Sequence, residues 1–190
     1  MKTVERTMSP CRKCGGLMTK SVRPEHTEDL GGVVVKILNA VQVRRCEACG
    51  TEMVAIPDLD GLARAAAISR ALEPARLAGR ELKFLRRVMD MTQKEFAEAM
   101  ELTPETVSRW ENDVRGVGGM CEKLVRHNIC ALLYKAARAR PYDPAVIAHM
   151  RFEALPEGGT LPPIEMVRVR IENPNTSDGE DITNGWAMAA

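Results

Sequence analysis

Several kinds of chemistry are missing from this chain of 190 residues. Aromatic side chains make up only 4% of it, and acidic and basic side chains nearly balance, at a net charge of +1. We therefore expect an aliphatic core, and a charge this small neither requires nor excludes a nucleic-acid partner. The sequence has no apolar run of membrane-spanning length. It also has no glycine-rich phosphate loop, paired-carboxylate motif or His-Glu-x-x-His sequence, so we expect neither an enzyme nor a small-molecule substrate.

Two pairs of cysteines are the most informative motif that is present. Cys11-Arg-Lys-Cys14 and Cys46-Glu-Ala-Cys49 each place two thiols on one tight turn, and glycine follows both pairs. Glycine allows the backbone to turn past a bound ion with a positive φ. Four thiolates in a closed tetrahedral shell favour zinc, at Zn–S distances of about 2.3 Å. The spacing therefore predicts one structural Zn²⁺ bound by Cys11, Cys14, Cys46 and Cys49.

Redox-active dithiols and disulfides are the alternative uses of these cysteines. A redox pair normally begins a helix, whose dipole lowers the thiol pKa, whereas here glycines follow the pairs and strand-like sequence separates them. Disulfides imply export, yet residues 1–20 carry several charges and no apolar signal-peptide core. We therefore expect reduced thiols and a cytoplasmic location. Cys121 and Cys130 are expected to be small buried apolar residues.

Residues 1–57 are expected to form the zinc-binding module. The runs 33–37 and 41–45 are rich in β-branched residues and flank Asn39-Ala40, which predicts a β-hairpin that returns Cys46 to the first cysteine pair. A sheet this small buries little apolar surface, so zinc would supply much of its stability.

Residues 79–152 predict an all-α domain, after a connecting helix and linker at 58–78. Thr92 and Glu95 form a capping-box pattern at the start of one short helix. Thr103-Pro104 begins the next helix after a very short join, and such joins set helices at a steep angle, as in a helix-turn-helix. The same apolar spacing would also suit an ordinary helical bundle.

A further helix, with Leu124 and Leu132 facing the core, is expected before an acidic extension at 153–190. Alternation of apolar residues and arginines over 167–171 predicts one strand. Residues 173–190 are polar and acidic and are expected to be largely disordered. The fold class is thus α+β with two modules, a small zinc-stabilised β-hairpin module followed by an all-α helix-turn-helix domain.

The second helix of this pair carries the candidate DNA-contacting residues. Val107 and Trp110 are expected to face inward, which leaves Glu105, Thr106 and Arg109 on the exposed face. Such side chains can reach base edges in the major groove, and Arg109 could form two hydrogen bonds with guanine. The plainer interpretation is a solvated Arg109 paired with Glu105, four residues earlier.

Two segments of the chain resemble known families. Met91-Thr-Gln-Lys-Glu-Phe-Ala-Glu-Ala-Met100 followed by Leu102-Thr-Pro-Glu-Thr-Val-Ser-Arg-Trp-Glu111 resembles the Xre (Cro/repressor-type) helix-turn-helix. The cysteine pairs with their glycines resemble the YgiT-type zinc finger. In this order, over residues 8–140, the combination is similar to MqsA-like antitoxins of bacterial toxin–antitoxin operons.

The resemblance implies roles for particular residues. The four cysteines would bind the structural zinc, Glu105 and Arg109 would reach bases, and Gln93 and Thr103 would contact the DNA backbone. One departure is Glu101, which stands where a turn glycine is common, and a left-handed conformation there would cost about 1 kcal/mol.

The resemblance also implies a biological role. It implies a homodimer that represses its own promoter by binding a palindromic double-stranded DNA operator, while the zinc module sequesters a small toxin protein. No catalytic residue is implied. The alternatives are a stand-alone zinc-finger helix-turn-helix regulator without a toxin, and a zinc-stabilised protein-interaction scaffold.

Overall fold

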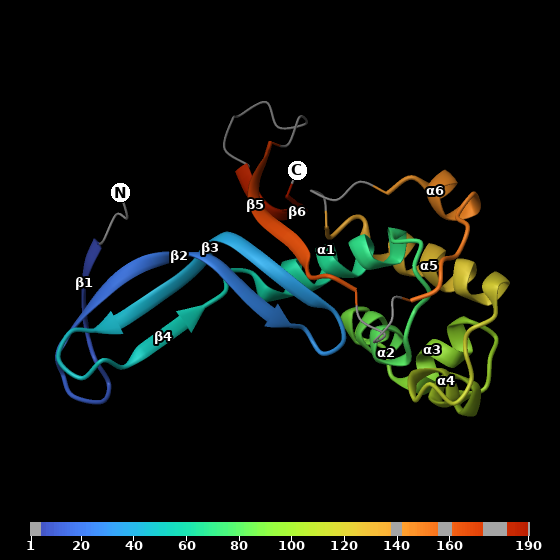
Figure 1. The fold of residues 1–190 in the computed structure, drawn as a ribbon, viewed down its shortest axis with the longest axis horizontal. Helices are drawn as coiled ribbons and strands as arrows, with labels where there is room; N and C mark the ends of the chain where they lie inside the picture. The colour runs from blue at the N-terminus through green and yellow to red at the C-terminus, as the bar shows by residue number, and fades with distance from the viewer. Residues whose placement is uncertain (1–4, 138–141, 156–160, 173–181, 190) are drawn as a thin grey trace.

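A computed structural model describes residues 5–137, 142–155, 161–172 and 182–189. These residues form a six-stranded sheet and a group of helices beside it (Figure 1). The α+β fold expected from the sequence is confirmed. A strand-rich region containing the cysteine pairs precedes the helical helix-turn-helix region.

Two long antiparallel strands form the centre of the sheet, β2 (Leu17–Asp29) and β3 (Val34–Cys46). A tight turn connects them. The Asp29 carboxylate accepts hydrogen bonds from the backbone N–H groups of Gly31 and Gly32 at 2.9 and 3.0 Å. Both glycines have a positive φ, of 88° and 151°, a conformation that other residues rarely adopt.

The hairpin predicted between residues 33–37 and 41–45 is wrong, because 34–37 and 41–45 belong to the single strand β3. Asn39 does adopt the left-handed conformation, with φ of 51°, but a two-residue hairpin turn of type I′ needs two such residues in succession. The chain bulges at Asn39 instead, opposite the register shift between Arg23 and Glu25 of β2.

The remaining strands extend this pair on both sides. β1 (Glu5–Pro10) pairs with β2, and β4 (Glu52–Ala55) pairs with the second half of β3. β5 (Ile164–Glu172) pairs in parallel with residues 35–38 of β3, and β6 (Ile182–Met188) pairs with β5. The bulge in β3 therefore separates a half that borders β4 from a half that borders β5.

The strand predicted at 167–171 is confirmed within β5. The expectation of disorder is wrong for 182–188, which form β6, whereas 173–181 lie outside the described residues. Trp186 provides the physical reason. It is only 2% exposed, and its indole N–H donates a hydrogen bond to the Asp58 carbonyl at 3.1 Å. Burial of this one large ring therefore holds the otherwise polar segment 182–188 against the fold.

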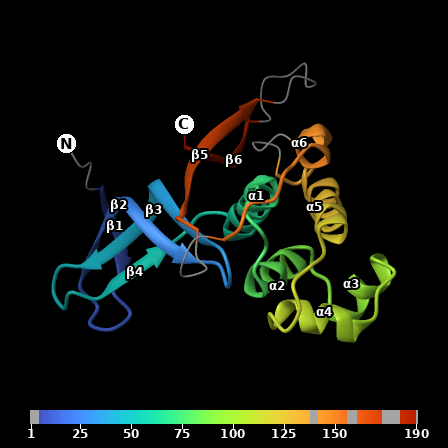
Figure 2. The same cartoon turned by 45° about the vertical axis from the view of Figure 1, so that its right-hand side comes forward.

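Helices make up most of the chain between β4 and β5. They are α1 (Leu59–Leu72), α2 (Gly79–Val88), α3 (Gln93–Ala99), α4 (Pro104–Glu111), α5 (Gly119–Leu133) and α6 (Pro144–Ala148). Figures 1 and 2 show α1 between strands β5 and β6 and the other helices. Among the described residues, none of the helices combines the length and apolar character needed to cross a bilayer.

One continuous hydrophobic core joins the sheet to the helices. Val35 and Ile37 of β3, Leu62 of α1, Leu85 of α2 and Met166 of β5 are all buried in it. A separate, smaller cluster of buried side chains consists of Cys11, Met18 and Cys46. Helix α1, expected to be a connector, is therefore part of the shared core, while the cysteine end of the sheet lies outside that core.

Candidate metal centre and nucleic-acid interface

The structure brings the four predicted zinc ligands together at the end of the sheet farthest from the helix-turn-helix (Figures 1 and 2). The loop between β1 and β2 carries Cys11 and Cys14, and the loop between β3 and β4 carries Cys49 directly beyond Cys46. All four Sγ atoms lie within 4.8 Å of one another, with Cys11–Cys49 at 3.7 Å and Cys14–Cys46 at 3.5 Å. A tetrahedral zinc with Zn–S bonds of about 2.3 Å would hold its sulfurs about 3.8 Å apart. The geometry fits a four-coordinate metal centre.

The two cysteine loops have the same backbone geometry. The Gly15 N–H donates to the Cys11 carbonyl at 2.8 Å, and the Gly50 N–H donates to the Cys46 carbonyl at 3.0 Å. Both glycines are left-handed, with φ of 74° and 71°, as their positions after the cysteine pairs predict. The matching turns direct both pairs of thiols toward a common centre.

Gly16 is required for its small size rather than for its backbone conformation. A Cβ atom at this position would lie 3.3 Å from both Cys14 Sγ and Cys46 Sγ, and 2.9 Å from the Ala48 Cβ. The Gly16 N–H also donates to Cys14 Sγ at 3.4 Å. The sequence points to a glycine here but not to the close contact between two loops that explains it.

Hydrogen bonds and neighbouring thiols shift the pKa values of these cysteines in opposite directions. The Thr51 hydroxyl, whose oxygen lies 3.1 Å from Cys49 Sγ, and the Thr51 amide lower the pKa of Cys49 to about 6. The Gly16 amide lowers the pKa of Cys14, but the Cys49 and Cys46 thiols outweigh it and raise that pKa to about 12. Four thiolates this close repel one another and need a cation between them. The cluster could thus bind a metal ion such as zinc.

The helix-turn-helix expected from the sequence is confirmed as α3 and α4. Thr92 caps α3 and exchanges hydrogen bonds with Glu95, at 2.7 Å from the Thr92 amide to the carboxylate and 3.2 Å from the Glu95 amide to the hydroxyl. The Thr103 hydroxyl caps α4 by accepting from the Thr106 amide at 3.3 Å. These are the caps that the sequence pattern predicts.

Glu101 lies at the turn between the two helices in the left-handed conformation, with φ of 53°. The Leu102 amide then donates to the Ala97 carbonyl at 2.8 Å, which closes the end of α3. A non-glycine residue accepts strain of about 1 kcal/mol in this conformation. The position normally suited to glycine is therefore filled by a strained, exposed acid.

A buried ion pair that the sequence does not reveal holds the helices together. The Arg86 guanidinium of α2 donates to both carboxylate oxygens of Glu111, at the end of α4, at 2.5 and 3.1 Å. Arg86 also donates to the Met91 carbonyl at 2.6 Å, and the Gln93 amide donates to Glu111 at 2.8 Å. Gln93, expected to contact the DNA backbone, thus lies half-buried at the start of α3 and also orients Glu111.

The exposed face of α4 carries the residues expected there. Val107 and Trp110 are buried, while Glu105 and Arg109 are exposed and Thr106 is half-buried. Within the part of the chain that the structure describes, no ion pair joins Arg109 to Glu105. The Arg109 charge still contributes, as the smallest of the causes, to the lowered pKa of Glu105, so the plainer interpretation keeps an electrostatic attraction without a direct ion pair.

The carboxylate of Glu105 is held at the N-terminus of α4. Its own backbone amide and the Thr103 hydroxyl lower its pKa below the usual range, so it is ionised at neutral pH. Gln93, Glu105 and Arg109 line one open hollow together with Pro104 and Ser108. Three of the five candidate DNA-contacting residues therefore converge on a single surface. The other two, Thr103 and Thr106, lie beside it, and their hydroxyl oxygens are 3.1 Å apart.

The prediction that Leu124 and Leu132 face the core is wrong, because they are 51% and 56% exposed. Val125, Ile129 and Leu133, at intervals of four residues, fill the inner side of α5 instead and set its rotation. Helix α5 therefore presents apolar side chains to solvent.

Comparison with known proteins bears on the helical region. Residues 82–118 match a family model described as Helix-turn-helix, and this segment begins in α2, includes both α3 and α4, and ends just before α5. The curated proteins and the solved structures gave no match to this chain. The match and the geometry of α3 and α4 together identify this region as the helix-turn-helix of a DNA-binding transcriptional regulator.

Proposed function

We propose that the protein is a sequence-specific repressor that binds its own operator with α4 in the major groove. The exposed face of α4 is the observation that carries this proposal. Glu105, Thr106 and Arg109 lie on it, while the opposite face is buried and the helix end is fixed by the Arg86–Glu111 pair. A helix held in this way can enter the groove without losing its orientation, because its anchoring contacts lie away from the DNA.

Each side chain on this face suits a particular contact. The Arg109 guanidinium can donate two hydrogen bonds to guanine, and the ionised Glu105 can accept one from the amino group of cytosine. Gln93 and Thr103 stand at the N-termini of α3 and α4, where free backbone N–H groups favour a phosphate. Because Glu105 repels phosphates, we assign it to a base rather than to the backbone.

We propose that the protein acts as a homodimer on a palindrome. Two copies of α4 would then lie about 34 Å apart, one turn of the DNA helix. The exposed apolar side chains of α5 support this arrangement, since Met120, Leu124 and Leu132 leave an apolar surface that a second copy would cover.

We propose one structural Zn²⁺ at Cys11, Cys14, Cys46 and Cys49. The spacing of the sulfurs and the all-thiolate ligand set support zinc over a hard cation. The ion would tie the β1–β2 loop to the β3–β4 loop and would leave no open coordination position for catalysis. Such a centre requires reduced thiols, in keeping with a cytoplasmic protein.

We propose that the zinc end of the sheet binds a small toxin protein, so that the repressor doubles as an antitoxin. The sequence resemblance motivates this proposal, and exposed apolar side chains on the adjacent strands support it. Leu17 is 59% exposed, and Val22, Met53 and Val54 are also exposed on β2 and β4. A regulator without a partner would leave these side chains in water.

A footprinting experiment tests DNA binding. The purified zinc-loaded protein is incubated with the DNA upstream of its own gene, and the protected bases are mapped over a range of salt concentrations. We expect one palindromic protected region and an affinity that falls steeply with salt, because phosphate contacts release counterions. No protected region and no measurable DNA binding at low salt would favour the scaffold interpretation instead.

Co-purification from the native operon tests the toxin partner separately. We expect a small neighbour-encoded protein in stoichiometric amount that arrests growth when expressed alone. Elution of the homodimer without such a protein would favour the stand-alone regulator and would leave DNA binding unaffected.

A further inference from the structure

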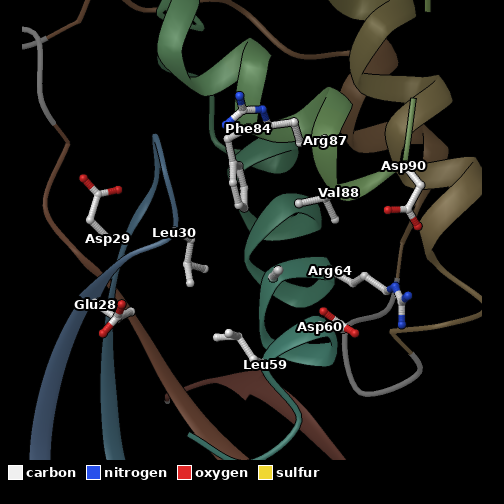
Figure 3. A pocket seen from close by; sticks show the side chains of 11 residues that line it. Glu28, Asp29, Leu30, Leu59, Asp60, Arg64, Phe84, Arg87, Val88 and Asp90 are labelled. Atoms are coloured by element: carbon white, nitrogen blue, oxygen red, sulfur yellow. The ribbon is translucent and has the colours of Figure 1, made fainter. Parts of the chain in front are cut away.

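Among the hollows lined by described residues, two lie between the sheet and the helices, outside both sites described above. The larger, of about 410 Å³, lies beside the tip of the β2–β3 hairpin (Figure 3). Leu30, Phe84 and Val88 contribute apolar surface, and charged side chains of both signs surround it in the figure. This mixed lining selects no particular ligand.

The smaller hollow, of about 220 Å³, is more specific in its chemistry. It lies where the end of α1 and the starts of α2, β3 and β5 meet the end of β6. Most of its wall is apolar, with Val33, Leu72, Ile164 and Met188 as contributors. These residues come from distant parts of the chain, so the hollow exists only when the whole fold is assembled. We call it the α1–β5 pocket.

Ser69 adds an unpaired polar group to the α1–β5 pocket. This residue lines the pocket and is 5% exposed, and its hydroxyl has no hydrogen-bond partner among the described residues. Serines within helices often relieve such burial by donating to the carbonyl four residues earlier, but Ser69 does not. Because a buried hydroxyl without a partner is destabilising, the site is one that a ligand oxygen would complete.

The charged side chains around the pocket balance one another. Arg70 donates to both carboxylate oxygens of Glu81, at 2.6 and 2.8 Å, and its remaining N–H groups donate to the backbone carbonyls of Ala75 and Arg76. Glu73 and Arg80, which carry opposite charges, are exposed in its lining. The lining therefore has no net charge to attract an ionic ligand.

We propose that the α1–β5 pocket binds a small uncharged molecule, an apolar ring or short chain with one hydroxyl or carbonyl oxygen that hydrogen-bonds to Ser69. The volume limits the ligand, since a dry apolar cavity of roughly 150 Å³ already holds benzene. A pocket of about 220 Å³ accommodates a ring of that size with a polar substituent. This inference goes beyond the proposed function and does not depend on DNA or toxin binding.

Titration of the full-length, zinc-loaded protein with phenol and with toluene tests the proposal. The two probes have rings of the same size, but only phenol carries the oxygen that Ser69 would bind. We expect saturable shifts in the backbone amide NMR signals of Gly32, Val33, Leu72 and Ile164 with both probes. Phenol shifts that do not saturate, or that saturate only elsewhere, would overturn the proposal.

Replacement of Ser69 separates the hydrogen bond from apolar burial. Ser69→Ala should weaken phenol binding about three- to tenfold, as expected for the loss of one hydrogen bond, and should leave toluene binding unchanged. Ser21→Ala, at a half-buried serine of β2 away from the pocket, should change neither. Equal phenol affinity in Ser69→Ala and the wild type would overturn the assignment.

A second variant keeps the test independent of Ser69. Leu72→Phe adds volume to the pocket wall and should weaken both probes by at least tenfold, because overpacking leaves no room for a second ring. Unchanged affinity for both probes in this variant would show that they bind elsewhere and would overturn the proposal.

Discussion

Single residues determine the chemistry of both sites. In the helix-turn-helix this residue is Arg109, through its guanidinium, and in the cysteine cluster it is Gly16, through its lack of a side chain. Arg109 is exposed and free of an ion pair with Glu105, so its fork of donors is available to a base. A Cβ at Gly16 would lie 3.3 Å from two sulfurs of the cysteine cluster, so the lack of a side chain there leaves room for the ligands to stay close. The sequence motif indicates Arg109 in advance, but the contact at Gly16 depends on two loops that are distant in sequence.

Replacement of Arg109 by alanine should weaken operator binding by about 1–3 kcal/mol and relax the preference at one base pair. Arg109→Lys should keep the charge but lose that preference, because lysine cannot form the two-pronged contact. Fluorescence anisotropy with the operator and its single-base variants measures both effects. Arg44→Ala, at an exposed arginine of β3, is the control, and an unchanged base preference in Arg109→Ala would remove Arg109 from the interface.

Introducing a methyl group at position 16 should loosen the metal centre. In Gly16→Ala the new Cβ would lie 3.3 Å from two sulfurs and 2.9 Å from the Ala48 Cβ, and such overpacking typically costs about 1–3 kcal/mol. Competition with a chromogenic chelator should therefore show zinc affinity about tenfold lower. Gly116→Ala is a matched control, because a Cβ there meets nothing within 4 Å. Equal zinc retention in the two variants would argue against tight packing around the sulfurs.

Helix ends were easier to predict than strand partners. The caps at Thr92 and Thr103 are local, since each side chain bonds an amide three residues later, and both were predicted from the sequence. The hairpin placed at Asn39-Ala40 was wrong, although the Gly31-Gly32 pair gave the better turn signal. Arg86 and Glu111, by contrast, are 25 residues apart, and no local sequence pattern indicates that they pair.

Neutralising Glu111 should destabilise the helix-turn-helix strongly. Glu111→Gln leaves the Arg86 charge buried with an incomplete partner, and breaking a buried ion pair costs about 3–5 kcal/mol. Urea unfolding followed by tryptophan fluorescence gives the free energy of unfolding, and a Trp186→Phe background leaves Trp110 as the remaining tryptophan. Glu98→Gln provides the contrast, because Glu98 pairs with Lys94 only at 3.9 Å on the surface, where such pairs contribute about 0.3–0.5 kcal/mol. Similar losses in both variants would mean that the buried pair does not fix these helices.

At the scale of the whole molecule, the two sites lie at opposite ends of the structure (Figure 2), and the continuous core includes the helix-turn-helix but not the cysteine cluster. The sequence predicted the α+β class because the cysteine spacing and the helix caps are local signals. It did not predict how the C-terminal strands close the sheet. Lys36 and Glu165, which form an ion pair at 3.1 Å across β3 and β5, are 129 residues apart, and pairing over such distances leaves no short-range pattern.

Removal of zinc should loosen only one end of the molecule. The cluster of Cys11, Met18 and Cys46 is separate from the main core, and small metal-bound modules depend on their ion for folding. After chelation, hydrogen exchange should accelerate in β4 and in the second half of β3, while residues 34–38 and α1 stay protected. Cys49→Ser should have the same effect without a chelator. A global loss of protection would show instead that zinc supports the whole core.

Trp186 tests whether the C-terminal extension belongs to that core. Its buried ring lies 5.1 Å from the Arg168 guanidinium carbon, and its N–H bonds the Asp58 carbonyl that precedes α1. Trp186→Ala should cost about 3–5 kcal/mol by leaving a cavity, whereas Trp186→Phe should keep most of the packing and lose mainly one hydrogen bond, about 1 kcal/mol. The chain has 2 tryptophans, so Trp110 remains in both variants as a fluorescent probe within the helix-turn-helix. If β6 were only appended to a self-sufficient domain, Trp110 would report the same urea midpoint in Trp186→Ala and Trp186→Phe, where it is the remaining tryptophan. A lower midpoint at Trp110 in Trp186→Ala than in Trp186→Phe would show that the last strand stabilises the DNA-binding helices through the shared core.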